Sequence, residues 1–276
     1  MQFDPADYLI EVLGEPAREM RNPVNAGYQC PFINAECTKR SHLIDGPFPV
    51  CSIARWIHSG KNRHNEGPIC ICPNRLYQAD IFKDVIKHCW PGEKPKKYKV
   101  AYEVSLSSLG KIDCVLAEIT SLNKIGQFVS VELQTVDITG TYFPAYDAFI
   151  NSRMLDSQPK YNFNWRNVYK RYIMQLIFKG FSHHHWNTRI VAVMQDVLVN
   201  RLWEIGNFAE SPIEKSNIVF LSYKMAPSSS EPGRFDLKLV RPIGTRHMDL
   251  MNGILYAEAP SKEAFLKKVI QRLAQA

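Results

Sequence analysis

Three stretches in the middle of the sequence alternate apolar and polar residues, and this pattern constrains the fold more than any other feature. They cover residues 98–106, 112–119 and 128–136. Alternation with period two is typical of β-strands that bury one face. Residues 123–127 include Gly126 and are short enough to form a turn. The second and third stretches are therefore predicted to pair as an antiparallel hairpin.

This predicted hairpin carries acidic residues in both of its strands. Asp113 follows Gly110-Lys-Ile at the entrance to the first strand, and Glu132 and Gln134 lie in the return strand. Residues two apart on a strand share a face, so Gln134 is expected beside Glu132. Two such carboxylates can hold Mg²⁺ between them, which is the layout of a metal-dependent phosphodiesterase. Acidic residues on neighbouring strands are common, so this hypothesis needs a second feature.

The sequence on either side of the hairpin predicts helices and further strands. Apolar residues recur at helical spacing in several segments, and other segments are short and strongly apolar. Strands and helices that alternate in this way indicate an α/β core with a mixed sheet. Helices are predicted at residues 5–21, 76–90, 167–179 and 262–273 (the last capped by Ser261), and strands at 189–199, 218–221 and 235–239.

The second feature is a set of four cysteines in a segment without regular periodicity, residues 22–75. Cys30, Cys37, Cys51 and Cys72 are separated by 6, 13 and 20 residues, which is too wide for a standard zinc finger. Four thiolates suit Zn²⁺ or a single iron, and either metal would hold a loop-rich module together. The alternative is four small buried hydrophobic residues. We prefer the metal module because the segment offers little apolar material for a core.

The remaining cysteines and the N-terminus bear on the compartment. Cys70 competes with Cys72 as the fourth ligand, whereas Cys89 and Cys114 fit a helix and a strand of the core. No basic segment followed by an apolar one is visible at the N-terminus, so we expect thiols or metal ligands in a reducing cytoplasm rather than disulfides. No apolar run approaches the roughly 20 residues of a membrane span.

The net charge of +7 and the pI near 9.0 favour an anionic partner such as nucleic acid. Basic residues are interleaved with aromatic ones over 94–99, 153–171 and 234–246, which suits a phosphate backbone. Charge by itself slightly favours an ordinary solvated basic surface, so the motifs decide the interpretation.

Taken together, these residues resemble the NotI-type restriction endonucleases, bacterial nucleases with a PD-(D/E)xK core and an N-terminal four-cysteine iron module. The resemblance covers roughly residues 28–180. The motifs that carry it are Cys30-Pro-Phe, Cys37-x-Lys39, Val50-Cys51, Cys72-Pro-Asn-Arg75, Glu103-Val-Ser-Leu, Asp113, Glu132-Leu-Gln-Thr-Val-Asp-Ile-Thr-Gly-Thr-Tyr142 and Asn167-Val-Tyr-Lys-Arg171 with Gln175 and Lys179.

The resemblance assigns roles to individual residues and divides the chain. It implies an N-terminal helix and metal module over residues 1–90 and a PD-(D/E)xK nuclease core over 91–276. It favours iron over zinc, and the Cys-Pro-Asn-Arg match decides against Cys70. The implied iron ligands are Cys30, Cys37, Cys51 and Cys72, the implied catalytic residues are Asp113, Glu132, Gln134 and Glu103, and Mg²⁺ is expected on Asp113 and Glu132.

The resemblance also implies an activity and partners. We expect a type II restriction endonuclease, a bacterial cytoplasmic homodimer that cuts double-stranded DNA at a specific GC-rich palindrome with Mg²⁺. On the helix over 167–179, candidates for DNA contact are Lys170, Arg171, Gln175 and Lys179. We favour the alternative, in which Arg171 and Lys179 contact only phosphate or pack on the hairpin near the active site. The run His183-His-His185 is more typical of a surface than of a metal cluster.

Two other functions remain open. One is a PD-(D/E)xK nuclease for repair or for cleavage of modified DNA, which would share every active-site residue. The other is a non-catalytic DNA- or RNA-binding protein with a metal-held module. The set Asp113, Glu132 and Gln134 argues against the second, because a binding protein gains nothing from carboxylates where phosphates approach. Metal-dependent cleavage distinguishes the two classes.

Overall fold

A six-stranded mixed sheet forms the centre of the computed structural model, which describes residues 2–20, 23–24, 26–59, 62–120, 124–256 and 261–274. The strand order is β14-β13-β12-β9-β8-β7; β12 runs parallel to both of its neighbours, and the other pairs are antiparallel. The predicted mixed sheet and the predicted hairpin, β8–β9, are confirmed. The strands are β7 (Tyr98–Ser105), β8 (Lys111–Ile119), β9 (Ile125–Leu133), β12 (Arg189–Gln195), β13 (Ile218–Pro227) and β14 (Phe235–Thr245).

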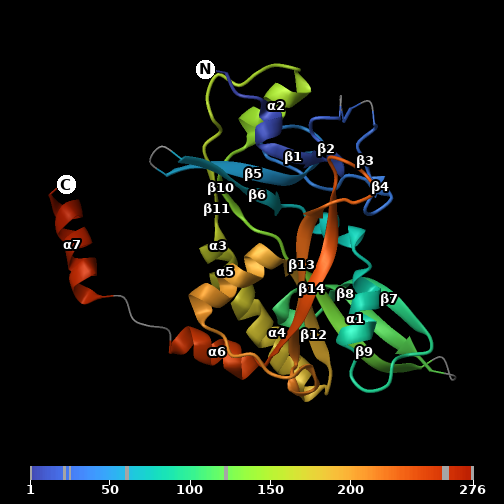
Figure 1. Ribbon diagram of the computed structural model, residues 1–276. Coiled ribbons are helices and arrows are strands. Elements are labelled where there is room, and N and C mark those ends of the chain that lie inside the picture. Colours follow the sequence, from blue (N-terminus) through green and yellow to red (C-terminus); the bar gives the residue numbers. More distant parts are fainter. Residues whose placement is uncertain are drawn as a thin grey trace.

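Helices cover both faces of this sheet (Figure 1). Val191 and Val193 of β12 face a core that includes α1, whereas Ile190, Ala192 and Met194 face a core that includes α4, α5 and α6. A strand buried on both faces is apolar at successive positions, as β12 is. The elements are η2 (Pro73–Gln78) and α1 (Ile81–His88) on one side, and α3 (Trp165–Val168), the π-helical turn η4 (Tyr169–Ile173), α4 (Met174–His185), α5 (Asp196–Gly206) and α6 (His247–Leu255) on the other.

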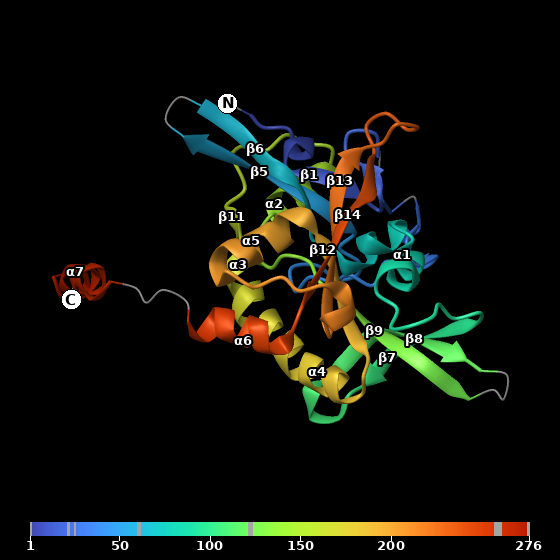
Figure 2. The same cartoon turned by 60° about the horizontal axis from the view of Figure 1, so that its bottom comes forward.

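A second sheet, ordered β2-β1-β5-β6, lies at the N-terminal end of the molecule. Its β5–β6 hairpin extends away from the body (Figure 2). The core under this sheet joins residues 8–71 with residues 136–163, so a later segment completes it. The elements are η1 (Pro5–Asp7), β1 (Leu9–Val12), β2 (Glu15–Pro16), β3 (Gln29–Cys30), β4 (Ala35–Glu36), β5 (Val50–Ser59), β6 (Asn62–Cys70), β10 (Ile138–Gly140), α2 (Phe143–Ile150) and β11 (Tyr161–Phe163).

The predicted N-terminal helix over residues 5–21 is wrong. Residues 9–12 form β1, which pairs antiparallel with β5, and Leu13 (φ 50°) and Gly14 (φ 77°) turn the chain towards β2. A short apolar run fits a helix and a strand equally well until its partner is known. The loop-rich interpretation of 22–75 is also wrong for β5 and β6, which are 10 and 9 residues long.

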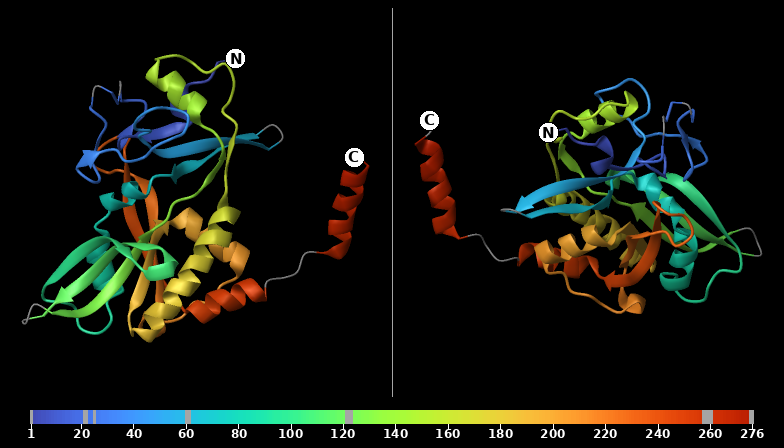
Figure 3. Two further views of the ribbon diagram at one scale, coloured as in Figure 1. Left: turned by 180° about the vertical axis from the view of Figure 1, so that it is seen from behind. Right: turned by 45° about the horizontal axis from the view of Figure 1, so that its top comes forward.

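Boundaries elsewhere follow the helix caps. Helix α1 begins after Asp80, whose carboxylate accepts the Lys83 N–H, and α7 (Lys262–Leu273) begins after Ser261, as predicted. The strand predicted at 189–199 ends at Gln195, and the chain continues as α5. Helix α7 stands apart from the other elements (Figure 3). Among the described residues, no helix is long and apolar enough to traverse a bilayer.

Candidate functional site

The predicted acidic pair lies where β8 and β9 part. The last paired residues at this end of the hairpin are Cys114 and Val131, and the next residue of β9, Glu132, lies beside Ala192 of β12. Asp113 Oδ2 accepts the backbone N–H of Leu133 at 2.7 Å. This hydrogen bond fixes the Asp113 carboxyl group against the strand that carries Glu132, so the structure brings the two predicted acids together.

The side chain of Glu132 faces helix α4. Lys179 Nζ lies 2.5 Å from Glu132 Oε1 and donates to the carbonyl oxygen of Lys111 at 2.7 Å. The side chains of this ion pair are 5% (Lys179) and 9% (Glu132) exposed. Two positions earlier on the same face of β9, Ser130 Oγ is 2.7 Å from His183 Nε2. Buried polar contacts therefore connect α4 to the hairpin at the point where the acids lie.

The residues predicted to contact DNA do not share one surface. Lys170, Arg171 and Gln175 are exposed, and their contact with DNA stays a prediction. Lys179 is 4% exposed and is not available for DNA contact, and the alternative in which it packs on the hairpin is confirmed. Because one helical turn takes 3.6 residues, Arg171, Gln175 and Lys179, spaced four apart, rotate steadily around the helix, and Lys179 reaches the buried face.

The histidine run differs from its predicted surface position at one residue. His183 is fully buried, with Nδ1 bonded to the carbonyl oxygen of Lys179 at 2.6 Å. A carbonyl oxygen only accepts, so Nδ1 carries a proton, and in the neutral ring Nε2 accepts from Ser130. His184 and His185 are exposed, as predicted.

Burial and mutual repulsion perturb both acids. Burial raises the pKa of Glu132 to about 7; contact with Lys179 lowers it, and the charges of Asp113 and Glu103 raise it. Burial also raises the pKa of Asp113, which the Leu133 N–H lowers and the charge of Glu103 raises. The raised pKa values mean that ionisation of these carboxyl groups is unfavourable in this poorly solvated place, and a bound cation would favour the ionised forms.

The other two predicted catalytic residues flank this pair. Glu103 on β7 is exposed, forms an ion pair with Lys111 at 3.2 Å and has a φ of 53°, in the left-handed region that non-glycine residues rarely adopt. Gln134 directly follows β9; its N–H donates to the Val193 carbonyl at 3.0 Å, and its side-chain amide donates to the Thr135 carbonyl at 2.5 Å. Both lie near the acids, and their roles stay predictions.

Sequence reasoning assigned no functional role to Tyr172, which lies on the same helical segment as Lys179. Tyr172 belongs to the π-helical turn and is 5% exposed, and among the described residues its hydroxyl has no hydrogen-bond partner. Burial raises the pKa of Tyr172, and the charges of Glu132 and Asp113 raise it further. The available signal was its separation from Lys179 by seven residues, two turns along one helix face.

The donor chemistry at this place fits magnesium. Carboxylate oxygens are hard ligands of the kind that Mg²⁺ binds, usually one or two per ion with water completing the shell. The buried hydroxyl of Tyr172 is close enough to both carboxylates for their charges to raise its pKa. In the part of the chain that the structure describes, no three His, Cys, Asp or Glu side chains are already arranged to hold a metal ion.

The four predicted thiol ligands lie on separate elements of the N-terminal half, and among the described residues no three of them have the geometry of a metal site. Cys30 ends β3, Cys37 follows β4, Cys51 lies in β5 and Cys72 precedes η2, and each is at most 5% exposed. Burial raises the pKa of Cys37, and the neighbouring Cys72 and Cys30 raise it further. Burial raises the pKa of Cys51 as well, again with Cys72 adding to the effect. Four sulfur donors are the set that suits iron or zinc, so the residue types fit.

The other cysteines belong to the apolar core around α1. Cys70 Sγ donates to the carbonyl oxygen of Cys72 at 3.3 Å, and burial raises its pKa to about 12. Cys89 and Cys114 are fully buried in the same core, which confirms the prediction for both. The choice of Cys72 over Cys70 as a ligand stays a prediction.

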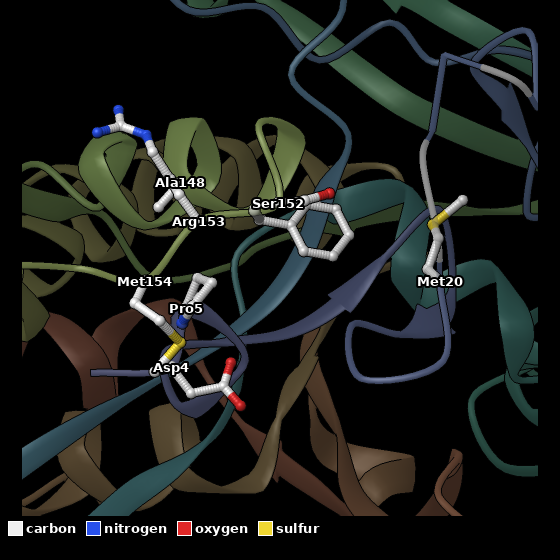
Figure 4. Close-up of a pocket in the computed structure, with 8 residues that line it drawn as sticks. Asp4, Pro5, Met20, Ala148, Ser152, Arg153 and Met154 are labelled. Carbon is white, nitrogen blue, oxygen red and sulfur yellow. The ribbon is translucent and has the colours of Figure 1, made fainter. Parts of the chain in front are cut away.

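A pocket at the other end of the molecule has a different character (Figure 4). Its volume is 550 Å³, and Asp4, Met20 and Arg153 are among the residues that line it. Its charged groups have protein partners: Asp4 pairs with Arg18 at 3.0 Å, and Arg153 pairs with Asp147. The pocket is lined by residues of η1 and α2, whereas Glu132 contacts Lys179 of α4, and α2 and α4 lie at opposite ends of the molecule (Figure 1), so the pocket is no part of the acidic site.

Comparison with known families adds an independent finding. The sequence model of a family described as "Restriction endonuclease NotI" matches residues 17–237, which include the acidic pair and all four predicted thiol ligands. A comparison with curated proteins gave no match.

Proposed function

The chain belongs to the NotI restriction endonuclease family, and from this premise we propose that it is a type II enzyme that cleaves double-stranded DNA by Mg²⁺-dependent hydrolysis. The observation that carries the proposal is the acidic pair, Asp113 held by the Leu133 N–H next to Glu132. The substrate we propose is a specific, GC-rich palindrome. A two-fold homodimer suits such a site, because each strand then meets one active site.

Hydrolysis of a phosphodiester requires a water in line with the leaving 3′ oxygen and compensation of the charge that grows on the phosphate. Asp113 and Glu132 would hold Mg²⁺, which when bound polarises both the water and the phosphate. Gln134 has a neutral amide that neither takes up a proton nor carries charge. It is suited to orient the water or to donate a hydrogen bond to a phosphate oxygen. Glu103 is placed to add negative charge to the same site.

We further propose that the sheet and its acids form a PD-(D/E)xK core and that the four thiols hold iron, with zinc as the alternative. Four thiolates complete a tetrahedral shell and leave no open position for a substrate, so this centre is structural. A structural metal would fix the loops that bear Cys30 and Cys37. Exposed Lys170, Arg171 and Gln175 are suited to phosphate contacts.

The test is digestion of unmethylated phage and plasmid DNA with Mg²⁺, followed by sequencing of the ends. Discrete fragments that share a palindromic end, abolished by EDTA and by Asp113→Ala, are expected. A smear of random ends would indicate a nuclease without a restriction site. Binding without any cleavage would contradict the proposal and favour recognition of modified DNA or a non-catalytic protein.

A further inference from the structure

We propose that the helical segment Trp165–His185 completes the acidic site with two positioning residues, Lys179, which orients the Glu132 carboxylate, and Tyr172, whose hydroxyl binds a water or phosphate oxygen there. This inference rests on the proposed hydrolysis. It assigns to a helix the positive charge and the hydroxyl that the strands do not supply.

The first observation is the contact of Lys179. Its ammonium group has three N–H donors, and two have protein acceptors, Glu132 Oε1 at 2.5 Å and the Lys111 carbonyl at 2.7 Å. A buried ammonium group is retained only where it is paired, because the loss of its hydration is costly. The carbonyl anchors Lys179 to β8 and the carboxylate anchors it to β9, so its position is set by both strands. One Glu132 oxygen is thereby engaged and the other is left for a cation.

The second observation concerns charge. Glu132, Asp113 and Glu103 interact with one another electrostatically, and the residue two positions after Glu132 is the neutral Gln134. Lys179 is the cation in contact with Glu132, and it reaches the site from α4. Compensation of one carboxylate allows two acids to remain ionised side by side in a poorly solvated place.

The third observation is independent of the lysine. Buried hydroxyl groups almost always have a hydrogen-bond partner, yet the hydroxyl of Tyr172 has none while it lies within electrostatic reach of Glu132 and Asp113. It belongs to a π-helical turn, a distortion that occurs frequently at functional sites. A partner that arrives with the substrate or its water explains both facts.

Replacement of Lys179 and replacement of Tyr172 should have different effects on metal affinity and on stability. Replacement of Lys179 makes the acidic site one charge more negative, so a divalent cation should bind more tightly while turnover falls. Replacement of Tyr172 by Phe removes only an unpaired hydroxyl, so the fold should be as stable as before or more stable while turnover falls. A purely structural lysine or tyrosine would produce neither combination.

The experiment compares Lys179→Met, Lys179→Arg and Tyr172→Phe with the full-length protein. The controls are Lys87→Met, an exposed lysine of α1, and Tyr256→Phe, an exposed tyrosine that directly follows α6; both lie outside the basic segments that suit a phosphate backbone. The measurements are single-turnover cleavage with Mg²⁺, Mn²⁺ binding by calorimetry without DNA, and thermal unfolding in EDTA. We expect cleavage to fall about 100-fold in Lys179→Met, the loss typical of one preorganised donor, with partial recovery in Lys179→Arg. We expect a fall of about tenfold in Tyr172→Phe, the value of one neutral hydrogen bond.

Folding is controlled separately. Lys179→Met leaves Glu132 buried without its partner, so the double variant Glu132→Gln/Lys179→Met, which removes both charges, should recover the unfolding temperature. Cleavage by both single variants at the rate of the controls overturns the inference. Weaker cleavage by Lys179→Met with unchanged Mn²⁺ affinity and no recovery in Lys179→Arg overturns the positioning role of the lysine. An inactive wild-type protein would instead contradict the proposed function itself.

Discussion

Two buried ion pairs, Arg75–Glu11 and Lys179–Glu132, show how differently the same chemistry can be used. Both acids lie on strands, and both pairs are buried, at 1% exposure for each partner in the first and 5% and 9% in the second. The Arg75 guanidinium donates to both oxygens of Glu11 at 2.9 Å and to the Phe235 carbonyl at 2.7 Å.

Most polar groups of the first pair have hydrogen-bond partners. Arg75 also donates to Gln78 Oε1 at 2.8 Å, and Ser52 Oγ donates to Glu11 Oε2 at 2.7 Å. A planar guanidinium meets a carboxylate with two parallel bonds, which fixes geometry as well as charge. The pair ties β1 and β5 of the N-terminal sheet to η2 and β14 of the central sheet, so its role is structural.

The second pair is incomplete. Lys179 contacts one oxygen of Glu132, a second acid lies nearby, and among the described residues the hydroxyl of Tyr172 has no partner. At the first site four of the five guanidinium N–H groups and both carboxylate oxygens are engaged, whereas the second site engages one carboxylate oxygen and leaves a hydroxyl without a partner. Buried polar groups without hydrogen-bond partners lower the free energy of unfolding, but they can bind a ligand.

The largest expected effect is on cleavage, and it distinguishes Asp113 from Gln134. Asp113→Ala should reduce Mg²⁺-dependent cleavage by at least about 1,000-fold, because a metal ligand contributes several kcal/mol to the transition state. Its unfolding free energy should not fall, since a buried like-charge neighbour of Glu132 is removed. Gln134→Ala should reduce cleavage less, because a neutral amide cannot replace a carboxylate. Equal losses in the two variants, measured as single-turnover rates, would reject this ranking.

The second prediction concerns the Arg75–Glu11 pair. Arg75→Met should lower the free energy of unfolding by about 3–5 kcal/mol, because Glu11 is left buried and unpaired. Urea titration followed by circular dichroism measures it. The double variant Glu11→Leu/Arg75→Met should recover most of the loss and should cleave DNA as the wild type does. An Arg75→Met protein as stable as the wild type would remove the contrast between the two pairs.

The third prediction tests the thiol cluster, a further structural element of the N-terminal half. Cys37→Ser should lower the free energy of unfolding by about 2.7 kcal/mol, the contribution of a ligand present at a hundred times its Kd. DNA binding and solubility should fall, while cleavage persists in the folded fraction. The matched control is Cys70→Ala, which should retain the metal. Elemental analysis should find one iron per chain in the wild type and in the control; full activity and stability in Cys37→Ser would contradict a structural metal.

The sequence predicts the acidic pair well because its signal is local. Strict alternation along β8 and β9 gives the strands, and period two gives the face on which Glu132 lies. The same local logic fails at the N-terminus, where the apolar spacing of Tyr8, Leu9 and Val12 fits a helix, yet pairing with β5 makes a strand. Pairing is a long-range property, so no window of sequence around residue 9 contains it.

The partners in the two buried ion pairs could not be predicted from the sequence. Arg75 and Glu11 are 64 residues apart, and Lys179 and Glu132 are 47 residues apart. Neither separation follows from periodicity. A lysine on an amphipathic helix is normally a surface residue, and only the strands beneath α4 turn Lys179 into a buried partner of the active-site acid. The residue types and their local faces are therefore predictable, whereas their partners are not.

The smallest expected effect is a pH dependence at the edge of the acidic site. Burial lowers the pKa of His183 below its ordinary value of 6.5, so His183 is neutral in the folded protein. As pH falls through 6.5, the unfolded chain takes up a proton that the folded protein does not, and the free energy of unfolding declines by up to about 1.4 kcal/mol per pH unit. His183→Gln should flatten this decline, measured by urea titration between about pH 7 and pH 5. His184→Gln, an exposed control, should not. If both variants decline as the wild type does, other groups dominate the acid sensitivity. The contact between α4 and β9 would then be held, like the Arg75–Glu11 region, by bonds that do not titrate in this range.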